Sequence, residues 1–226
     1  EKTLYRIKSL IDFGDVTQGT LGGFIEKETN LSHDGNAWVY GDAMVYGNAE
    51  VCDNAKAYGN AMIYGDAKVC NNAKVCNNAK VYGNACLYGY AKACNDACVW
   101  GSAKVGGNAK VCNNAKVYGN AEVYDYANVH DDACVYGNAM VYDDACVYDN
   151  ARVCDNAKLC DNAWVCDNAM VRGNDDCLYF KGLGSHNRTT AFFKCRDGHI
   201  HVSCGCFNGN LVAVSYTHLT LATNRE

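Results

Sequence analysis

The sequence predicts an all-β protein whose main body is a single-stranded parallel β-helix, and three observations carry this prediction. Alanine recurs every six residues from Ala37 to Ala169 without a slip of phase. An aliphatic residue or a further alanine stands two positions after each of these alanines. The block 36–173 therefore holds 23 consecutive hexads with no insertion. A repeat this short and regular is typical of a β-solenoid.

Each hexad predicts one short strand followed by one corner. The alanine and the aliphatic residue are two positions apart, so they point to the same side of a strand, while the residue between them points to the other side. Two positions rich in Gly, Asn and Asp come next, and these residues favour turns and left-handed backbone conformations. We therefore expect Ala and Val to fill a narrow interior, with Lys, Tyr and Cys outside.

Three hexads per coil give 18 residues, so residues i and i+18 lie one above the other. The 23 hexads then form between seven and eight coils. At the usual strand spacing the rod is roughly 37 Å long. Each coil pairs with the coils next to it, as in other solenoids.

The pattern resembles the hexapeptide repeat of left-handed parallel β-helices, the family of trimeric acyltransferases. Val39 with Ala43, and Val45 with Ala49, fit the two inward positions of that repeat. The chain departs from it after the valine, where it places Tyr or Cys. The resemblance implies left-handed winding, and it implies an acyltransferase site between the subunits of a trimer.

Both ends of the chain lie outside the hexads. Residues 1–35 are expected to cap the first coil, although Leu4, Ile7, Leu10 and Ile11 have near-helical spacing. The stretches 5–16 and 22–32 resemble the leader of bacterial and phage hexapeptide-repeat proteins described as transferases. Residues 174–213 are expected to form a small β-meander, and residues 214–226 resemble a non-native tail from a sequencing linker.

Composition limits the possible partners and locations. The net charge is −5, which argues against a nucleic-acid partner. No apolar run approaches the length of a membrane span, and we expect no membrane partner and no secretion leader. Twelve of the 16 cysteines lie within the hexads, where Cys alternates with Tyr. Reduced thiols and a cytoplasmic or virion-associated location are the expectation.

The 18-residue rule places six aromatic residues in one column on one face: Tyr46, Tyr64, Tyr82, Trp100, Tyr118 and Tyr136. We call this column the aromatic ladder. Stacked rings stabilise neighbouring strands, and this is the favoured interpretation. The alternative is a binding surface for carbohydrate, another rod or a second chain, because an exposed apolar stripe often marks an interaction site.

A second face carries a lysine ladder and a cysteine ladder. The lysines are Lys56, Lys74, Lys92 and Lys110, and the cysteines are Cys76, Cys94 and Cys112. Like charges one coil apart are mildly destabilising, and a solvated basic face is the default interpretation. The thiol row is a weak candidate for soft metal ions, because a straight row supplies poor tetrahedral geometry. We also expect no metal near the C-terminus, where Cys177, Cys195, Cys204 and Cys206 are predicted to be core thiols, and His199 and His201 surface residues.

His130 is the single histidine of the hexads and a weak catalytic candidate. Its acidic neighbours Asp131 and Asp132 suit a general base. The favoured interpretation is that it fills a Tyr or Cys position of its column. The sequence therefore predicts a non-catalytic structural or interaction rod without a cofactor, which associates with itself as a trimer or head to tail. The alternatives are an acyltransferase-like enzyme and a carbohydrate-binding surface.

Overall fold

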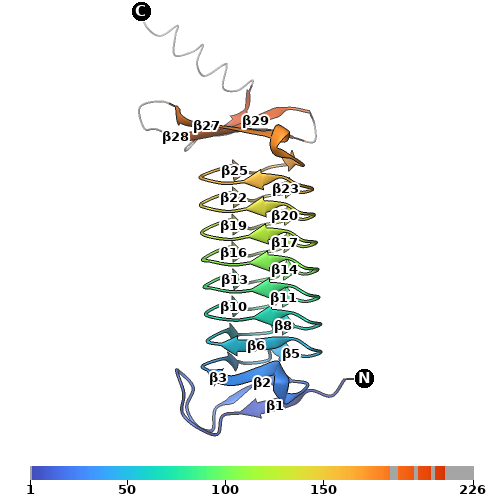
Figure 1. The fold of residues 1–226 in the computed structure, drawn as a ribbon, viewed down its shortest axis with the longest axis vertical. Helices are drawn as coiled ribbons and strands as arrows, with labels where there is room; N and C mark the ends of the chain where they lie inside the picture. Colours follow the sequence, from blue (N-terminus) through green and yellow to red (C-terminus); the bar gives the residue numbers. More distant parts are fainter. Residues whose placement is uncertain (1, 184–187, 196–197, 205–206, 212–226) are drawn as a thin grey trace, which may run out of the picture.

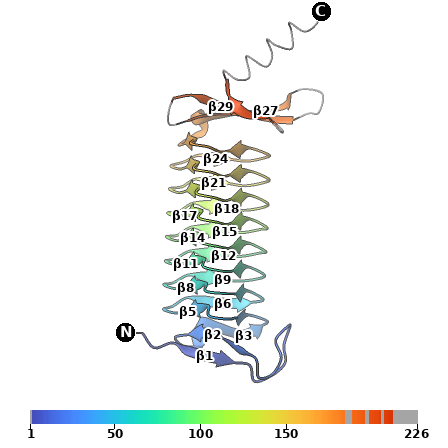
Figure 2. The same cartoon turned by 180° about the vertical axis from the view of Figure 1, so that it is seen from behind.

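The computed structural model describes residues 2–183, 188–195, 198–204 and 207–211. These residues form a parallel β-solenoid of about eight coils, with a short N-terminal hairpin at one end and an antiparallel sheet at the other (Figures 1 and 2). The predicted all-β parallel solenoid is confirmed. The predicted tail 214–226 and residue Cys206 lie outside the described residues.

Three parallel sheets form the faces of the solenoid. The first face contains β1 (Tyr5–Lys8), β2 (Leu21–Ile25), β5 (Met44–Val45), β8 (Met62–Ile63), β11 (Lys80–Val81), β14 (Cys98–Val99), β17 (Lys116–Val117), β20 (Cys134–Val135), β23 (Arg152–Val153) and β26 (Met170–Val171), with β1 antiparallel to β2. The second face contains β4 (Trp38–Val39), β7 (Lys56–Ala57), β10 (Lys74–Val75), β13 (Lys92–Ala93), β16 (Lys110–Val111), β19 (Asn128–Val129), β22 (Cys146–Val147) and β25 (Trp164–Val165). The third face contains β3 (Leu31–Gly35), β6 (Glu50–Asp53), β9 (Lys68–Val69), β12 (Cys86–Leu87), β15 (Lys104–Val105), β18 (Glu122–Val123), β21 (Met140–Val141) and β24 (Lys158–Leu159).

The register between coils is the predicted 18 residues. Lys74 pairs with Lys92, and Lys92 pairs with Lys110. Backbone hydrogen bonds join successive coils, as in the bond from the Lys92 amide to the Ala109 carbonyl at 2.9 Å. Because the register does not shift along the hexads, every outward position becomes a column parallel to the axis.

The interior is the predicted one. Ala43 and Val45 are 0% exposed, and the same holds for the alanines and aliphatic residues of the later hexads. Small alanine side chains let three strands approach one axis, and the branched residues fill the remaining space at high packing density. The corners use the left-handed region, with φ +60° at Asn113 and +61° at Gly107. Asn, Asp and Gly are the residues that enter this region most readily.

The N-terminal segment covers the first coil. Despite the near-helical spacing of its apolar residues, Tyr5–Lys8 is a strand that pairs with β2. Gly23 lets β2 lie directly on the coil, because a Cβ there would be 2.4 Å from the Ala43 carbonyl oxygen. The single-turn 3-10 helix η1 (Glu28–Asn30) places the buried Asn30 amide against the carbonyls of Gly47 and Ala49.

The C-terminal sheet is antiparallel, in the order β27 (Cys177–Leu183), β28 (Arg188–Lys194), β29 (Ile200–Cys204) and β30 (Phe207–Asn210). The 3-10 helix η2 (Asn174–Asp176) connects it to the last coil. The expected surface position of His201 is wrong, since the side chain is buried. It faces the last coil of the solenoid, whereas Ile200 is exposed.

Replacement of Val111 by Ala tests the interior. We expect the variant to lose about 2 kcal/mol of unfolding free energy, because buried methyl groups are removed and a cavity remains. Urea denaturation measures this loss. Lys110→Ala, one position earlier and pointing outward, is the matched control and should change stability by less than about 0.5 kcal/mol. Equal losses for the two variants would contradict the inward assignment of Val111.

Candidate functional site

The aromatic ladder on the first face is continuous. Its neighbouring rings lie 4.4–5.7 Å apart between centroids, and their planes differ by 1–4°. Each inner ring therefore has a ring on both of its faces, and the edges are what the ladder presents to solvent.

The two end rings of the ladder also have partners. The Lys2 ammonium lies 5.1 Å from the centroid of Tyr46, a favourable cation–π distance. At the other end, a hydrogen bond with Cys154 and partial burial raise the pKa of Tyr136 to about 12. A sugar ring stacks on an exposed aromatic face, and both faces of the four inner rings are covered by neighbouring rings. The geometry therefore favours the stabilising role of the ladder over the carbohydrate-binding alternative.

The four predicted lysines of the second face are in register, but they do not share one environment. Lys56 forms an ion pair with Asp15 and lies 5.7 Å from the ring centroid of Tyr40. The hydrogen bond from Lys56 lowers the pKa of the Asp15 carboxyl. Lys74, Lys92 and Lys110 are exposed, and none of them forms an ion pair with another described residue.

A groove of about 560 Å³ runs beside these three unpaired lysines. Tyr90 and Tyr126 also line it, with 62% and 61% of their surfaces exposed. The full lining is Asn72, Lys74, Tyr90, Lys92, Asn108, Lys110, Tyr126, Asn128 and Asp144. Unpaired ammonium groups beside amide and phenol groups can hold an anionic group on this face.

The cysteine ladder lies two residues from the lysines. Hydrogen bonds from Cys112 and Cys76 lower the pKa of the Cys94 thiol, and the nearby Lys92 ammonium contributes in the same direction. The same hydrogen bonds raise the pKa of Cys76 and of Cys112. Cys94 thus favours the thiolate, with a thiol donor on each side.

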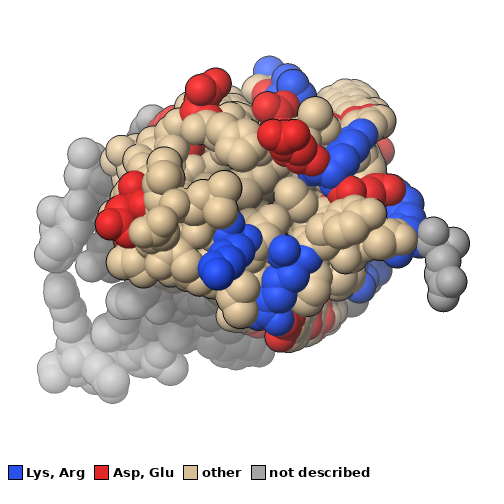
Figure 3. All heavy atoms as spheres, turned by 90° about the horizontal axis from the view of Figure 1, so that it is seen from below, with Lys and Arg blue, Asp and Glu red and all other residues tan. Residues whose placement is uncertain are grey.

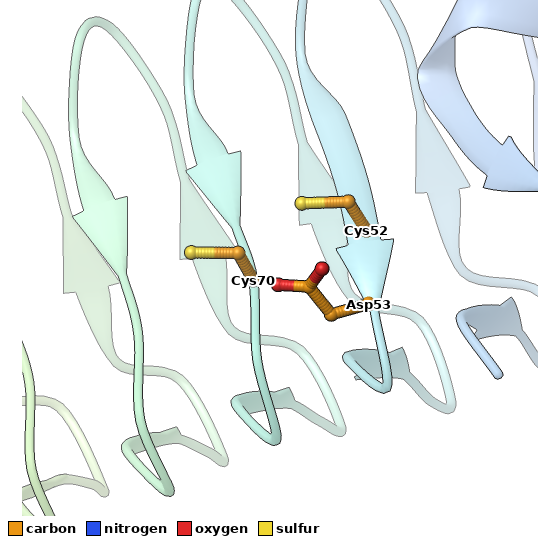
Figure 4. Close-up of side chains that lie close together, drawn as sticks. All are labelled: Cys52, Asp53 and Cys70. Carbon is orange, nitrogen blue, oxygen red and sulfur yellow. The ribbon is translucent and has the colours of Figure 1, made fainter. Parts of the chain in front are cut away.

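Two other groups of side chains come closer to a metal-binding arrangement than the cysteine ladder does. In each, three ligand atoms lie within 4.8 Å of one another. The first comprises Cys52, Asp53 and Cys70 on the third face (Figure 4). The second comprises Cys166, Asp167 and His201.

The first of these groups has protonated thiols and a carboxylate that already accepts hydrogen bonds. Burial raises the pKa of Cys52 to about 11 and that of Cys70 to about 12, so both thiols stay protonated near neutral pH. The Asp53 carboxylate accepts hydrogen bonds from the Asn71 backbone amide at 2.8 Å and from its side-chain amide at 3.1 Å. Protonated thiols and an occupied carboxylate make a poor metal centre.

His130 lies in a hydrogen-bonded chain. Its Nδ1 is 2.8 Å from Asp131 Oδ2, and its Nε2 is 3.3 Å from the Sγ of Cys146. The ring stacks on Tyr148 with centroids 5.3 Å apart. A carboxylate, an imidazole and a thiol in this order can position a base beside a nucleophile. Burial raises the pKa of Cys146 to about 11, so the thiol is neutral until the histidine accepts its proton.

Sequence reasoning identified His130 and missed Cys146. The 18-residue register could have indicated this contact, because it places Tyr148 on His130, and Cys146 is two positions before Tyr148. An outward strand side chain and a corner side chain of the preceding coil can therefore meet.

Truncation of Tyr82 tests the stabilising role of the aromatic ladder. Tyr82→Ala removes two ring pairs, with Tyr64 and with Trp100. At ~0.5–1.5 kcal/mol for each pair beyond the buried area, we expect a loss of unfolding free energy of at least about 1 kcal/mol. Tryptophan fluorescence during urea denaturation measures it.

The matched control for this variant is Tyr126→Ala, whose ring is exposed. We expect a loss below about 0.5 kcal/mol. If both variants lose the same unfolding free energy, ring stacking does not stabilise the solenoid.

Comparisons with known proteins agree with this fold. A family model described as the YdcK β-solenoid repeat matches residues 133–149. An uncharacterised acetyltransferase, YdcK of Escherichia coli strain K12, is 49% identical over 37 residues, which cover 16% of this chain. The match spans 11% of the length of that relative. Among the described residues, no helix has the length and apolar character needed to cross a bilayer. The repeat match, the relative and the parallel solenoid together fit a hexapeptide-repeat β-helix protein.

Proposed function

We propose that this protein is a structural β-solenoid, a rigid rod that holds binding surfaces at fixed spacing and associates with further copies of itself. The observation that carries the proposal is the unbroken 18-residue register from β4 to β26, braced by the stacked rings of the aromatic ladder. Such a rod needs no bound cofactor to keep its shape. Its faces differ in chemistry, so a partner can distinguish them.

The charge distribution supports self-association as the interaction. Residues 56–116 carry eight lysines and two aspartates, a net charge of +6. Residues 118–176 carry three basic and twelve acidic residues, a net charge of −9. Seen along the axis from the N-terminal end, both signs of charge appear (Figure 3). Because this end has no single sign, side-by-side pairing of the basic and acidic halves of two rods fits better than end-to-end contact.

The thiols support a reducing location for the rod, the cytoplasm or a virion assembled there. Ten cysteines of the hexads are free thiols in the described part of the chain: Cys52, Cys70, Cys76, Cys86, Cys94, Cys98, Cys112, Cys146, Cys154 and Cys160. A reducing compartment keeps such thiols from cross-linking neighbouring rods.

Light scattering across a salt series tests the association. We expect the average mass at low ionic strength to exceed that of the 24.5 kDa chain and to fall as salt screens the two halves. The variant Lys92→Glu with Lys110→Glu should reduce the mass at low salt, while Lys8→Glu with Lys27→Glu, at exposed positions outside the two charged halves, serves as the charge-matched control. A mass that does not depend on ionic strength contradicts the proposal.

A second candidate function is acyl transfer, and one observation favours it. His130 joins Asp131 and Cys146 in one hydrogen-bonded chain, and the relative described above is named an acetyltransferase. In this reading His130 accepts a proton from the attacking group, and Asp131 holds the imidazole in the required orientation.

Thermal unfolding with acetyl-coenzyme A tests the second candidate. If the chain binds this donor, we expect stabilisation of several degrees, since a ligand that binds the folded state alone stabilises it by mass action. Coenzyme A should then be released as its acetyl group passes to the Cys146 sulfur, with the thiol proton moving through His130 to the leaving thiolate. His130→Ala should slow this release by at least about 100-fold. Tyr148→Phe keeps the stacked ring and is the control. If millimolar acetyl-coenzyme A causes no thermal shift and no coenzyme A is released, the acyl-transfer function is excluded and the structural role remains.

A further inference from the structure

The junction between the solenoid and the C-terminal sheet brings together three side chains that bind metals. Cys166 and Asp167 form the corner after β25, in the last complete coil of the second face. His201 lies in β29 of the antiparallel sheet, 34 residues after Asp167. The three residues therefore come from two separate sheets.

The distances between the donor atoms suit one small ion. Cys166 Sγ lies 3.7 Å from His201 Nε2 and 3.7 Å from Asp167 Oδ2. His201 Nδ1 lies 3.2 Å from Asp167 Oδ2. Around a tetrahedral zinc ion, sulfur and nitrogen or oxygen ligands at their usual bond lengths are about 3.5 Å apart. The two distances from His201 involve different ring nitrogens, and an ion binds only one of them. With one donor atom taken from each residue, the three atoms still lie within 4.8 Å of one another, so a rotation of the imidazole with small shifts of the other side chains would bring all three to bonding distance.

Burial and packing hold the two strongest donors in place. Cys166 is 0% exposed, and His201 is 7% exposed. The His201 ring stacks on Phe193 in β28, with centroids 4.9 Å apart and planes 13° from parallel. The Asp167 carboxylate is half-exposed, which leaves a path for an ion to enter.

Neighbouring corners show what is special about this one. Three consecutive hexads end in the same dipeptide, at Cys154-Asp155, Cys160-Asp161 and Cys166-Asp167. The distance from sulfur to the carboxylate is similar in all three, 3.8, 3.6 and 3.7 Å. Of these three corners, Cys166-Asp167 alone forms a three-donor group with a histidine in the part of the chain that the structure describes.

We propose that Cys166, Asp167 and His201 bind one Zn²⁺ ion that fastens the C-terminal sheet to the end of the solenoid. Sulfur, nitrogen and oxygen donors together are the ligand set that zinc accepts, with water in the fourth position. Binding replaces the proton of the Cys166 thiol, so affinity rises with pH. This site goes beyond the scaffold function, and neither depends on the other.

Zinc titration of the full chain in a thiol-protecting reductant tests the site. The chain is first freed of metal with a chelator and then titrated with ZnCl₂ against a chromophoric competitor. We expect one tight equivalent per chain and a rise in the thermal unfolding midpoint on its addition. Cys166→Ser and His201→Gln should each weaken the tight equivalent by more than about tenfold and remove the thermal shift.

Cys160→Ser is the matched control, because it removes a thiol from the same corner position one hexad earlier. It should keep both the tight equivalent and the thermal shift. Cobalt(II) titration gives a readout that does not depend on the variants folding, since tetrahedral coordination with one thiolate produces visible absorption and a sulfur charge-transfer band.

Three results would overturn the proposal. One is the absence of a tight zinc equivalent in the wild-type chain. Another is zinc binding that survives Cys166→Ser but is lost in Cys52→Ser, which would place the ion in the group on the third face. A cobalt spectrum of octahedral type would also exclude the three-donor site.

Discussion

In-register stacking of identical hexads is the constraint on which the structure depends. Each coil donates backbone hydrogen bonds to the next, so the residue 18 positions ahead lies beneath every side chain. A parallel sheet of two-residue strands is weak alone, and it persists because three such sheets share one packed interior. The chemical character of the surface therefore varies from one column of side chains to the next. A change of one outward residue in a hexad changes one position of one column.

The corners connect this constraint to chemistry. Their left-handed residues place side-chain amides above one another, and Asn77, Asn95, Asn113 and Asp131 form a chain of hydrogen bonds at 2.7–2.8 Å. The last of these bonds, from Asn113, lowers the pKa of the Asp131 carboxyl, and His130 contributes further. A ladder that satisfies the turns thus also fixes the carboxylate beside His130. Structural and chemical roles share the same atoms.

The sequence alone predicted what repetition determines. The solenoid, the 18-residue register, the inward Ala43 and Val45 and the stacked aromatic column follow from the hexad period and strand alternation.

The sequence could not predict contacts between different elements of the fold, or contacts between neighbouring columns of side chains. The pairing of Lys56 with Asp15 depends on the fold of the N-terminal segment, which has no repeat. The contact of Cys146 with His130 depends on side-chain direction between neighbouring columns. Burial of His201 depends on how the C-terminal sheet packs on the last coil, and strand alternation within β29 does not contain that information.

Chemically distinctive positions of this rod occur where a column changes its residue type. The strand column of the second face runs through three unpaired lysines and then changes to Asn128, Cys146 and Trp164. The corner column beside it changes from cysteine to His130, then to Tyr148 and Cys166. A uniform column offers every coil the same environment, so it stabilises the rod without singling out a site. A break in the column places unlike groups one coil apart, at distances that the register fixes. The histidine chain and the junction cluster both lie on this face at positions where its columns change, and the groove lies beside the lysines that precede the change.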